Sequence, residues 1–529
     1  MSSRQINPKL IPSPRPMPAP LSRRDFLKLA ALLPAAQMAW PLFVGEPHQP
    51  AADPSAPNVL FLVFDTLSAP HMSLFGYPRP TTPNMDRFAG QAFVYHNHHA
   101  GANFTSPGTA SLLTGTLPWT HRAIHLQGTV EHALAGHNLF ALLAGRGYFQ
   151  TAYTHNLLVM SLLDQFKDSL DAFVPARELC LVDDQFSDQL FPNDYTDGFL
   201  AEWQYLRGGR NRPGSLFLGW LHRLMRYSHK SSLTAELGRQ FPRGVPSLHN
   251  LFFILEDAIN WVRAQAATLP QPWFSYVHLL PPHEPYTTRR GFLDVFKDGW
   301  QPDTKPEGRF TEHMPPAQLL LNRRHYDEYL AYVDAEFGRL MDNLEADGVL
   351  DNTYIILTSD HGESFERGIR GHVTQVLYEP LLRVPLLIRP PGGAPSRRDF
   401  HHLTSNIDLL PTVQTITGGQ VPPWAEGRAL APFGSPDQER AIFSIEAKSN
   451  PKHAPLAKST VAMLKGDYKI IQYAGYEAGD PSFEVYDIRR DPDELADIYP
   501  TNKPVAVELH AELTERLRQA NAPFLAADQ

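Results

Sequence analysis

The sequence predicts an α/β fold in which a mostly parallel central sheet carries helices on both faces, followed by a small antiparallel-sheet subdomain. Two uncharged apolar runs, Asn58–Phe64 and Thr353–Thr358, are typical of buried strands in a parallel sheet. Between residues 58 and 420, strand-like and helix-like segments alternate, which favours parallel strands joined by helical crossovers. From residue 421 to 529 short strand-like runs take over, and they predict a small α+β subdomain.

Each expected element follows from its local pattern. Runs rich in β-branched and aromatic residues predict strands at residues 58–64, 148–154, 273–279, 353–358 and 384–388. Apolar residues at helical spacing, with helix start and stop signals, predict helices at residues 83–91, 111–114, 138–146, 251–269, 319–344 and 407–417. In the C-terminal part we expect strands at residues 441–446, 460–464, 468–473 and 483–486, and a closing helix at residues 504–521.

Residues 160–245 fit this alternation least, and we interpret them as an insertion of helices and loops with basic patches around residues 223–230. Long insertions on compact domains are often functional. Two interpretations stay open: a lid or substrate-selecting segment over the site, and an insertion with no role there.

Composition excludes several classes of function. A chain of 529 residues can bury a large core, and its 43% hydrophobic and 19% charged content is ordinary for a globular protein. The net charge of -9 gives no indication of the basic surface that nucleic-acid binding requires. The single cysteine, Cys180, cannot form a disulfide within the chain or a cysteine metal cluster, and we expect it to be structural.

Residues 1–57 are expected to be a leader and linker. Ser22-Arg23-Arg24-Asp25-Phe26-Leu27-Lys28 matches the twin-arginine export pattern, and an apolar stretch at residues 29–44 follows it. That stretch is short for a membrane span and is interrupted by Pro34 and Pro41. The sequence therefore predicts recognition by the twin-arginine export machinery and a periplasmic or extracellular protein. Two interpretations stay open: a free protein, and one tethered to the membrane by its leader.

Side chains of the metal-binding kind follow two of the predicted buried strands. Asp65 comes directly after residues 58–64, and Asp360 and His361 come just after residues 353–358. In open α/β sheets, ligands bind beyond the carboxyl ends of the strands. The pattern therefore predicts a metal site at one edge of the sheet, and with it an enzyme.

A hydroxyl-rich segment precedes a predicted helix start. Thr105 and Ser106 lie just before Pro107-Gly108, and the unpaired N–H groups of a helix N-terminus suit a bound anion. A hydroxyl that also contacts a metal can be ionised and act as a nucleophile. Taken alone, the segment is better explained as an ordinary helix N-cap.

Many short motifs also occur in one order along the chain. They are Asp65-Thr66-Leu67, Tyr77, Thr82-Pro83-Asn84-Met85-Asp86, Ala110-Ser111-Leu112-Leu113-Thr114-Gly115, Pro282-His283-Glu284-Pro285-Tyr286, Thr358-Ser359-Asp360-His361-Gly362-Glu363, Gly371-His372, Arg383-Val384-Pro385-Leu386, Asp408-Leu409-Leu410-Pro411-Thr412, Gly427-Arg428 and Tyr486-Asp487. In this order they resemble the sulfatase family of the alkaline phosphatase superfamily, over roughly residues 57–500 without most of 160–245. The resemblance implies an alkaline phosphatase-like fold and an ester hydrolase or transferase.

The chain departs from that family at three positions. The family places Cys, or sometimes Ser, two residues before the motif proline and oxidises it to formylglycine, whereas this chain has Thr105, which cannot form that aldehyde. Thr66 replaces the family's second Asp, and Thr109 replaces its Arg. These differences make the chain similar to the branch that keeps a threonine nucleophile, which includes phosphoethanolamine transferases, lipoteichoic-acid-type synthases and some phosphodiesterases.

The resemblance also implies roles for individual residues. Asp65, Thr105, Asp360 and His361 would hold one divalent metal ion, with Mn²⁺, Zn²⁺ or Mg²⁺ favoured over Ca²⁺ because an imidazole is present among the oxygens. His283 and His372 are implied on the substrate side, with His372 able to protonate the leaving group. For Arg428 two interpretations stay open: it binds the substrate anion, or it only ties the small subdomain to the large domain.

Several neighbouring residues receive structural interpretations. Glu363 is expected to orient His361, and His278, inside the 273–279 strand, is expected to belong to the core. His96, His98 and His99 have strand-like spacing, so they are not expected to share a second metal site.

A threonine ester favours phosphorus over sulfur chemistry. A formylglycine hydrate can eliminate sulfate, whereas a threonine ester must be attacked by water or another alcohol, a displacement that phosphorus undergoes readily. The expected function is therefore a metal-dependent hydrolase or transferase of phosphate, phosphonate or diester substrates through a covalent Thr105 intermediate. The alternatives are a sulfuric ester hydrolase and an inactive relative that binds anionic glycans.

Overall fold

The computed structural model describes residues 53, 55–174, 176–181, 216–248, 251–501 and 503–525. The expectations for the leader and for residues 182–215 of the insertion lie outside these residues. Residues 50–529 form one compact unit. Among the described residues, the structure contains no helix with the length and apolar character needed to cross a membrane.

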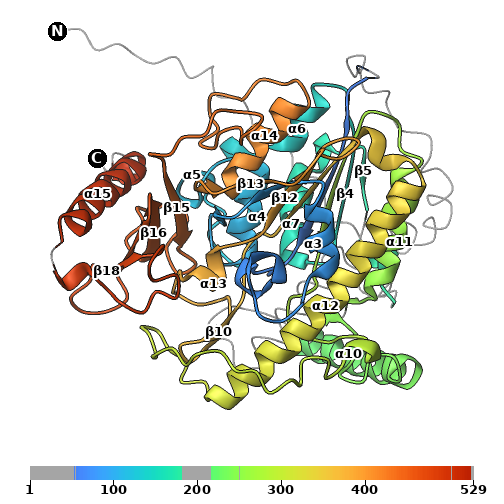
Figure 1. The fold of residues 1–529 in the computed structure, drawn as a ribbon, viewed down its shortest axis with the longest axis horizontal. Coiled ribbons are helices and arrows are strands. Elements are labelled where there is room, and N and C mark those ends of the chain that lie inside the picture. Colours follow the sequence, from blue (N-terminus) through green and yellow to red (C-terminus); the bar gives the residue numbers. More distant parts are fainter. Residues whose placement is uncertain are drawn as a thin grey trace, which may run out of the picture. The chain divides into compact units, whose positions relative to one another are not determined.

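The predicted central sheet is present and has eight strands (Figure 1). Its strands, in spatial order, are β13 (Arg398–Phe400), β2 (Phe93–Tyr95), β12 (Leu386–Arg389), β9 (Thr353–Thr358), β1 (Asn58–Phe64), β8 (Trp273–Leu279), β4 (Phe149–Thr154) and β5 (Ala172–Phe173). The pairs from β9 through β1, β8 and β4 to β5 are all parallel, and β12 runs antiparallel to both of its neighbours. The sheet is therefore mostly parallel.

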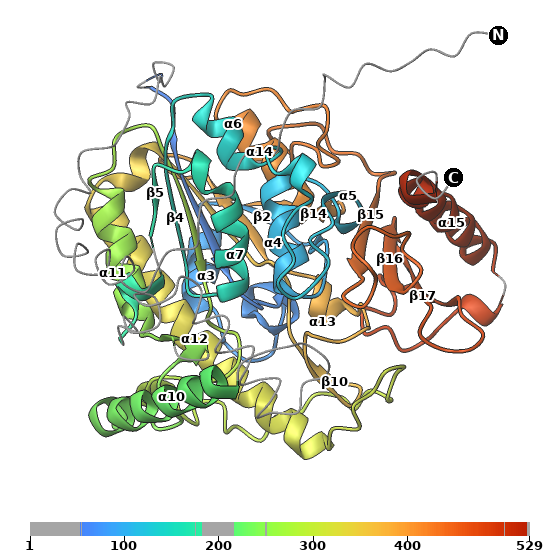
Figure 2. The same ribbon diagram turned by 180° about the vertical axis from the view of Figure 1, so that it is seen from behind.

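Helices cover both faces of this sheet. Alternate residues of β1 point to opposite faces, and because those residues are apolar, both faces must be covered. Leu60, Leu62 and Phe64 join one core cluster, whereas Val59, Phe61 and Val63 join another. Residues of α3 (Pro83–Ala89), α11 (Leu255–Ala266) and α12 (Pro316–Ala346) fill the first cluster. Residues of α4 (Thr105–Thr114), α6 (Leu139–Ala144), α7 (Leu157–Phe166) and α14 (Leu409–Ile416) fill the second. Figures 1 and 2 show α11 and α7 on opposite sides of β4 and β5.

Three helix starts differ from the expectation by at least three residues, including that of α12, which begins at Pro316 instead of residue 319. The helix expected from residue 111 begins at Thr105, because Pro107 falls in its first turn, where a missing N–H breaks no helical hydrogen bond. The helix expected from residue 251 begins at Leu255, because Leu251–Phe252 forms β7 and pairs with β6 (Ser247–Leu248). Residues 406–408 form a 3-10 turn before α14.

The C-terminal part is an antiparallel sheet of four strands, close to the expected boundaries. The strands are β15 (Ala441–Glu446), β16 (Ser459–Lys465), β17 (Tyr468–Ala474) and β18 (Ser482–Asp487), and α15 (Pro504–Leu525) shares a core with them. The remaining short elements are β3 (His98–His99), α5 (Pro118–His121), β10 (Ser364–Glu366), β11 (Ile369–Gly371), α13 (Glu379–Leu382) and β14 (Thr404–Ser405), with α10 (Leu216–Leu237) in the insertion.

Candidate active site and metal centre

Three neighbouring parallel strands end at one buried group of side chains. Asp65 directly follows β1, Asp360 lies just beyond β9, and His278 is the penultimate residue of β8. The register pairs Val63 with Thr358 on one side and with His278 on the other, so the three strands end level. This is the edge at which α/β sheets bind ligands.

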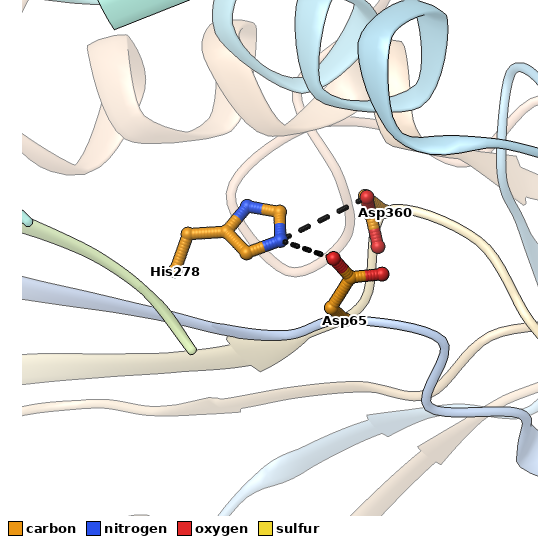
Figure 3. Close-up of side chains that lie close together, drawn as sticks. All are labelled: Asp65, His278 and Asp360. Atoms are coloured by element: carbon orange, nitrogen blue, oxygen red, sulfur yellow. Dashed lines mark ion pairs between the residues drawn. The ribbon is translucent and has the colours of Figure 1, made fainter. Parts of the chain in front are cut away.

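The three side chains point toward one another (Figure 3). His278 Nε2 lies 3.5 Å from Asp65 Oδ2 and 3.8 Å from Asp360 Oδ2. Their candidate ligand atoms all lie within 4.8 Å of one another, and all three residues are buried. The hydroxyl of Tyr276 lies 3.1 Å from His278 Nδ1, which fixes the ring and leaves Nε2 facing the carboxylates.

The chemistry of this group fits a divalent cation. Across the described residues, Asp65 Oδ1, Asp360 Oδ2 and His278 Nε2 are buried without a hydrogen-bond partner. Each unpaired buried polar atom is costly, and two adjacent buried carboxylates cost more. A bound cation would satisfy all three atoms at once, and carboxylate with imidazole is a common donor set for Mn²⁺ and Zn²⁺.

The titration of the two carboxylates agrees with this arrangement. Burial and the negative charge of Asp65 raise the pKa of Asp360 well above its ordinary value. Burial alone would raise the pKa of Asp65 too, but the nearby imidazoles of His278 and His283 outweigh it and lower that pKa. Without a cation, these surroundings therefore favour the ionised form of only one of the two carboxyl groups. A bound cation would favour ionisation of both.

His361 and Thr105 border the same carboxylates. His361 Nε2 lies 3.5 Å from both Asp65 Oδ1 and Asp360 Oδ2, and 3.3 Å from Thr105 Oγ1. The Nδ1 atom of His361 is 3.0 Å from the carbonyl of Gly362, so Nδ1 carries the proton and Nε2 is the free lone pair. Burial, reinforced by His372, lowers the pKa of His361 well below its ordinary value, which keeps the ring neutral.

Asn156 contacts both the carboxylate of Asp65 and the hydroxyl of Thr105, although no sequence motif marks it as a site residue. Its Nδ2 donates to Asp65 Oδ2 at 2.5 Å and lies 3.5 Å from Thr105 Oγ1. Its Oδ1 accepts from the N–H of Leu158 as the N-cap of α7. The N-cap pattern was the available signal, but it does not reveal what the amide nitrogen reaches.

A row of imidazoles extends from this group. The rings of His361 and His372 are 4.5 Å apart, and those of His372 and His283 are 4.8 Å apart. Glu363 lies 3.1 Å from His372 Nδ1, so it orients His372 and not His361, which corrects the expectation for Glu363.

Burial, with the charge of His283, lowers the pKa of His372 to about 3, and burial raises the pKa of Glu363 well above its ordinary value. The pKa of His283 is raised because the charges of Asp65 and Glu363 outweigh burial.

His278 also departs from its sequence interpretation. It is fully buried, as expected for a core residue, yet its Nε2 faces two carboxylates. The ring contributes to the candidate metal centre and does not pack as an apolar side chain.

Arg428 makes no described contact with the other predicted site residues. Its guanidinium pairs with Asp437, and its side chain is 58% exposed. It lines a surface hollow with His402 and Arg440 and other residues outside the candidate site.

The three histidines of residues 96–99 have separate partners, which are Asp399, Asn406 and Glu379 in chain order. Their side chains do not converge on one point. This agrees with their strand-like spacing, which places neighbouring side chains on opposite faces.

The backbone after Asp65 is strained. Thr66 has a φ of 61°, in the left-handed region that β-branched residues rarely adopt. Its carbonyl accepts a hydrogen bond from Tyr326 at 2.7 Å, which helps to hold this conformation. Such strain gathers at functional sites.

Comparison with known proteins agrees with this fold and site. The sequence model of the sulfatase family matches residues 57–419, and that of the N-sulphoglucosamine sulphohydrolase C-terminal region matches residues 372–522. A choline-sulfatase from Rhizobium meliloti is 25% identical, with 84% of this chain and 82% of that protein covered. An N-acetylglucosamine-6-O-sulfatase from Bacteroides thetaiotaomicron is 26% identical, with 88% and 87% covered.

Among solved structures, the phosphonate monoester hydrolase of Agrobacterium radiobacter superposes with a TM-score of 0.61 at 21% identity, covering 88% of this chain and 96% of that one. Sulfatase-family enzymes bind a divalent metal, which agrees with the buried Asp65, His278 and Asp360. Because the family model spans well over half of the sequence, the chain belongs to the sulfatase family and is an ester hydrolase of that family.

Proposed function

We propose that this protein is a metal-dependent hydrolase or transferase that cleaves phosphate or phosphonate esters, including diesters, through a covalent intermediate on Thr105. The observation that carries the proposal is the setting of the Thr105 hydroxyl. It lies at the first residue of α4, 3.3 Å from His361 Nε2 and 3.5 Å from Asn156 Nδ2. A hydroxyl at a helix N-terminus beside a cation site is placed to attack an anionic ester.

Asp65, Asp360 and His361 would hold the cation, with His278 as a further donor. When bound, the cation would lower the pKa of the Thr105 hydroxyl and neutralise charge on the ester oxygens. Mn²⁺, Zn²⁺ or Mg²⁺ is proposed over Ca²⁺, because a site with two imidazoles and two carboxylates offers fewer oxygens than the roughly six to eight that Ca²⁺ takes.

The proposed reaction has two displacements at phosphorus. In the first, a bond forms between Thr105 Oγ1 and phosphorus, the bond to the leaving oxygen breaks, and the hydroxyl proton of Thr105 passes to solvent. The leaving oxygen takes a proton from the pair of His372 and Glu363, whose hydrogen bond occupies Nδ1 and leaves Nε2 for the substrate. In the second, the oxygen of water or of an acceptor alcohol bonds to phosphorus and gives its proton to the pair of His372 and Glu363. The bond between phosphorus and Thr105 Oγ1 breaks, and Thr105 Oγ1 takes a proton from solvent.

Phosphorus is favoured over sulfur because a threonine ester lacks the elimination route open to a formylglycine hydrate. Hydrolysis of sulfate esters is the second candidate, and it is supported by relatives named choline-sulfatase and N-acetylglucosamine-6-O-sulfatase. A relative named multifunctional alkaline phosphatase superfamily protein PehA, from Trinickia caryophylli, is 22% identical and supports a broader range of esters.

The test compares kcat/KM for a bis-aryl phosphodiester, an aryl phosphonate monoester, an aryl phosphate monoester and an aryl sulfate on the metal-loaded protein. Thr105→Ala should lower kcat/KM at least about 1,000-fold, because the nucleophile is lost. Thr105→Ser should keep part of the activity. Thr114→Ala, at the other end of α4, is the matched control and should keep nearly all of it.

Quenched reactions should also show the phosphoryl group on the peptide that contains Thr105, by mass spectrometry. Phosphodiester cleavage that survives Thr105→Ala would exclude the covalent mechanism. A preference for the aryl sulfate would select the second candidate.

We further propose export through the twin-arginine route, on the basis of Arg23 and Arg24 before an apolar stretch. Fractionation of cells that produce the whole chain should find it outside the cytoplasm. The substitutions Arg23→Lys and Arg24→Lys together should retain it inside, and export of that variant would contradict the proposal.

A further inference from the structure

Helix α10 carries four large apolar side chains exposed to solvent. Phe217, Trp220, Leu224 and Tyr227 are 73%, 55%, 65% and 75% exposed. They follow one another at intervals of three or four residues, so they form one continuous stripe along the helix. Exposed apolar patches of this kind mark interaction surfaces.

The opposite side of α10 is attached to the protein. Leu233 is buried and belongs to the core cluster that also contains α11 and α12, and His222 is buried as well. The apolar stripe is therefore not a core face that the helix failed to bury. Figures 1 and 2 show α10 at the same end of the molecule as β10.

Two basic side chains lie along one side of the stripe. Arg223 and Lys230 are exposed, and α10 contains one acidic residue, Glu236, whereas the whole chain has a net charge of -9. Arg223 lies over the ring of Trp220, with its guanidinium carbon 5.8 Å from the ring centroid. Arg223 and Lys230 line an open hollow of about 340 Å³ together with Trp220, Leu224, Arg226 and Tyr227.

We propose that the exposed face of α10 docks on an anionic lipid bilayer. An amphipathic helix with Trp, Phe and Leu on one face and flanking Lys and Arg lies in the membrane interface, where its apolar side chains enter the acyl boundary. Trp and Tyr prefer this depth because their rings are apolar and their tips are polar. The flanking cations complement the anionic headgroups, which distinguishes this occupant from an uncharged apolar partner.

The experiment measures binding of the whole protein to vesicles by sedimentation. Vesicles of phosphatidylcholine with about one-third phosphatidylglycerol should bind the protein, and pure phosphatidylcholine vesicles should bind it at least about tenfold more weakly. Raising the salt concentration should weaken binding to the anionic vesicles, because screening reduces the attraction of exposed charges.

Two pairs of substitutions separate the two contributions. Trp220→Ala with Leu224→Ala removes apolar contact, and Arg223→Gln with Lys230→Gln removes charge. Each pair should weaken binding to anionic vesicles about tenfold or more. Leu495→Ala with Val507→Ala is the matched control, because these side chains are also exposed and apolar, at 52% and 58%, and it should bind like the unsubstituted protein.

All variants should keep the same circular dichroism spectrum and the same activity on a soluble aryl ester, because the substituted residues lie outside the candidate site. Failure of the unsubstituted protein to bind anionic vesicles would overturn the proposal. Equal binding by the Trp220→Ala and Leu224→Ala variant would do so as well. Self-association in sedimentation velocity that disappears in this variant, without vesicle binding, would instead assign the face to a second copy of the chain.

Discussion

At the scale of single residues, Asn156 has the sharpest consequence for catalysis. Its amide nitrogen donates to Asp65 Oδ2 and lies near Thr105 Oγ1, so it fixes the position of the carboxylate relative to the hydroxyl. A hydrogen bond to a charged group contributes about 1.5–3 kcal/mol, so Asn156→Ala should lower kcat/KM about 10- to 100-fold. Steady-state kinetics on the preferred ester measures this loss.

The same substitution also removes the N-cap of α7, which costs about 1 kcal/mol of stability. Asn138→Ala is the matched control, because Asn138 caps α6 through the same kind of contact with the N–H of Ala141. Both variants should melt at similarly lowered temperatures, but only Asn156→Ala should lose activity. Equal activity losses would mean that Asn156 acts through fold stability alone.

The sequence predicts the site residues that follow a recognisable local pattern. Asp65 and Asp360 follow uncharged strand runs, so their place at the sheet edge follows from the pattern alone. The roles of His278 and Asn156 depend on the order β9-β1-β8-β4, which brings β8 and β4 beside β1. That order is set by packing across the whole sheet, and no local pattern encodes it.

At the scale of elements, the site depends on how closely α4 approaches the loop after β9. A Cβ atom built on Gly108 would lie 2.4 Å from the carbonyl oxygen of Asp360. Gly108→Ala should therefore push the start of α4 away from Asp360, destabilising the protein by about 1–3 kcal/mol. A displacement of about 1 Å at the nucleophile should lower kcat/KM about 100-fold.

Gly136→Ala is the control for this prediction, because a Cβ atom at Gly136 would meet no atom within 4 Å. Both variants are compared by kinetics and thermal unfolding. If Gly108→Ala keeps full activity, the close approach of α4 is not required for the positioning of Thr105.

A second contact between elements should give stability a dependence on pH. Asp334, on α12, accepts hydrogen bonds from the N–H groups of Asn84 and Met85 at the start of α3. Burial outweighs these bonds and raises the pKa of Asp334 from 3.8 to about 6. A raised carboxyl pKa contributes stability below about pH 4 that is lost as the pH rises toward 6, at most about 3 kcal/mol.

Asp334→Asn removes this titration. The difference in melting temperature between the variant and the unsubstituted protein should therefore shift in favour of the variant between pH 4 and pH 7. A difference that is constant across this range would show that Asp334 has an ordinary pKa.

Elements were predictable where the local pattern and the tertiary environment agree. The boundaries of β8, β9 and β15 coincide with the expected runs because each run is apolar or alternating over its full length. The sequence predicts too late a start for α4 because Pro107 suggests a helix break, although proline is tolerated in a first turn. It predicts a helix at Leu251–Phe252 because a two-residue strand is too short to show its own period.

At the scale of the whole molecule, the two sheets are joined through shared cores. Leu117, Trp119 and Ile407 pack with residues of the C-terminal sheet, and Leu377 and Leu381 pack with Ile471 on β17. A buried ionic group adds to this, because Lys469 Nζ on β17 lies 3.0 Å from Glu379 Oε1 on α13 and 2.7 Å from Glu494 Oε1. We therefore expect both sheets to unfold in one cooperative transition.

Lys469→Met tests this coupling. Lys469 is fully buried, and its removal would leave two buried carboxylates without their cation, which costs about 3–5 kcal/mol. Lys465→Met is the matched control, since Lys465 pairs with Glu512 at a partly exposed position on β16, where an ion pair contributes about 0–1 kcal/mol. Calorimetry should show a single peak for all three proteins, shifted strongly to lower temperature only by Lys469→Met. Two separate peaks in the unsubstituted protein would contradict the cooperative unit, because the C-terminal sheet would then melt without disturbing the strands that hold Asp65, His278 and Asp360.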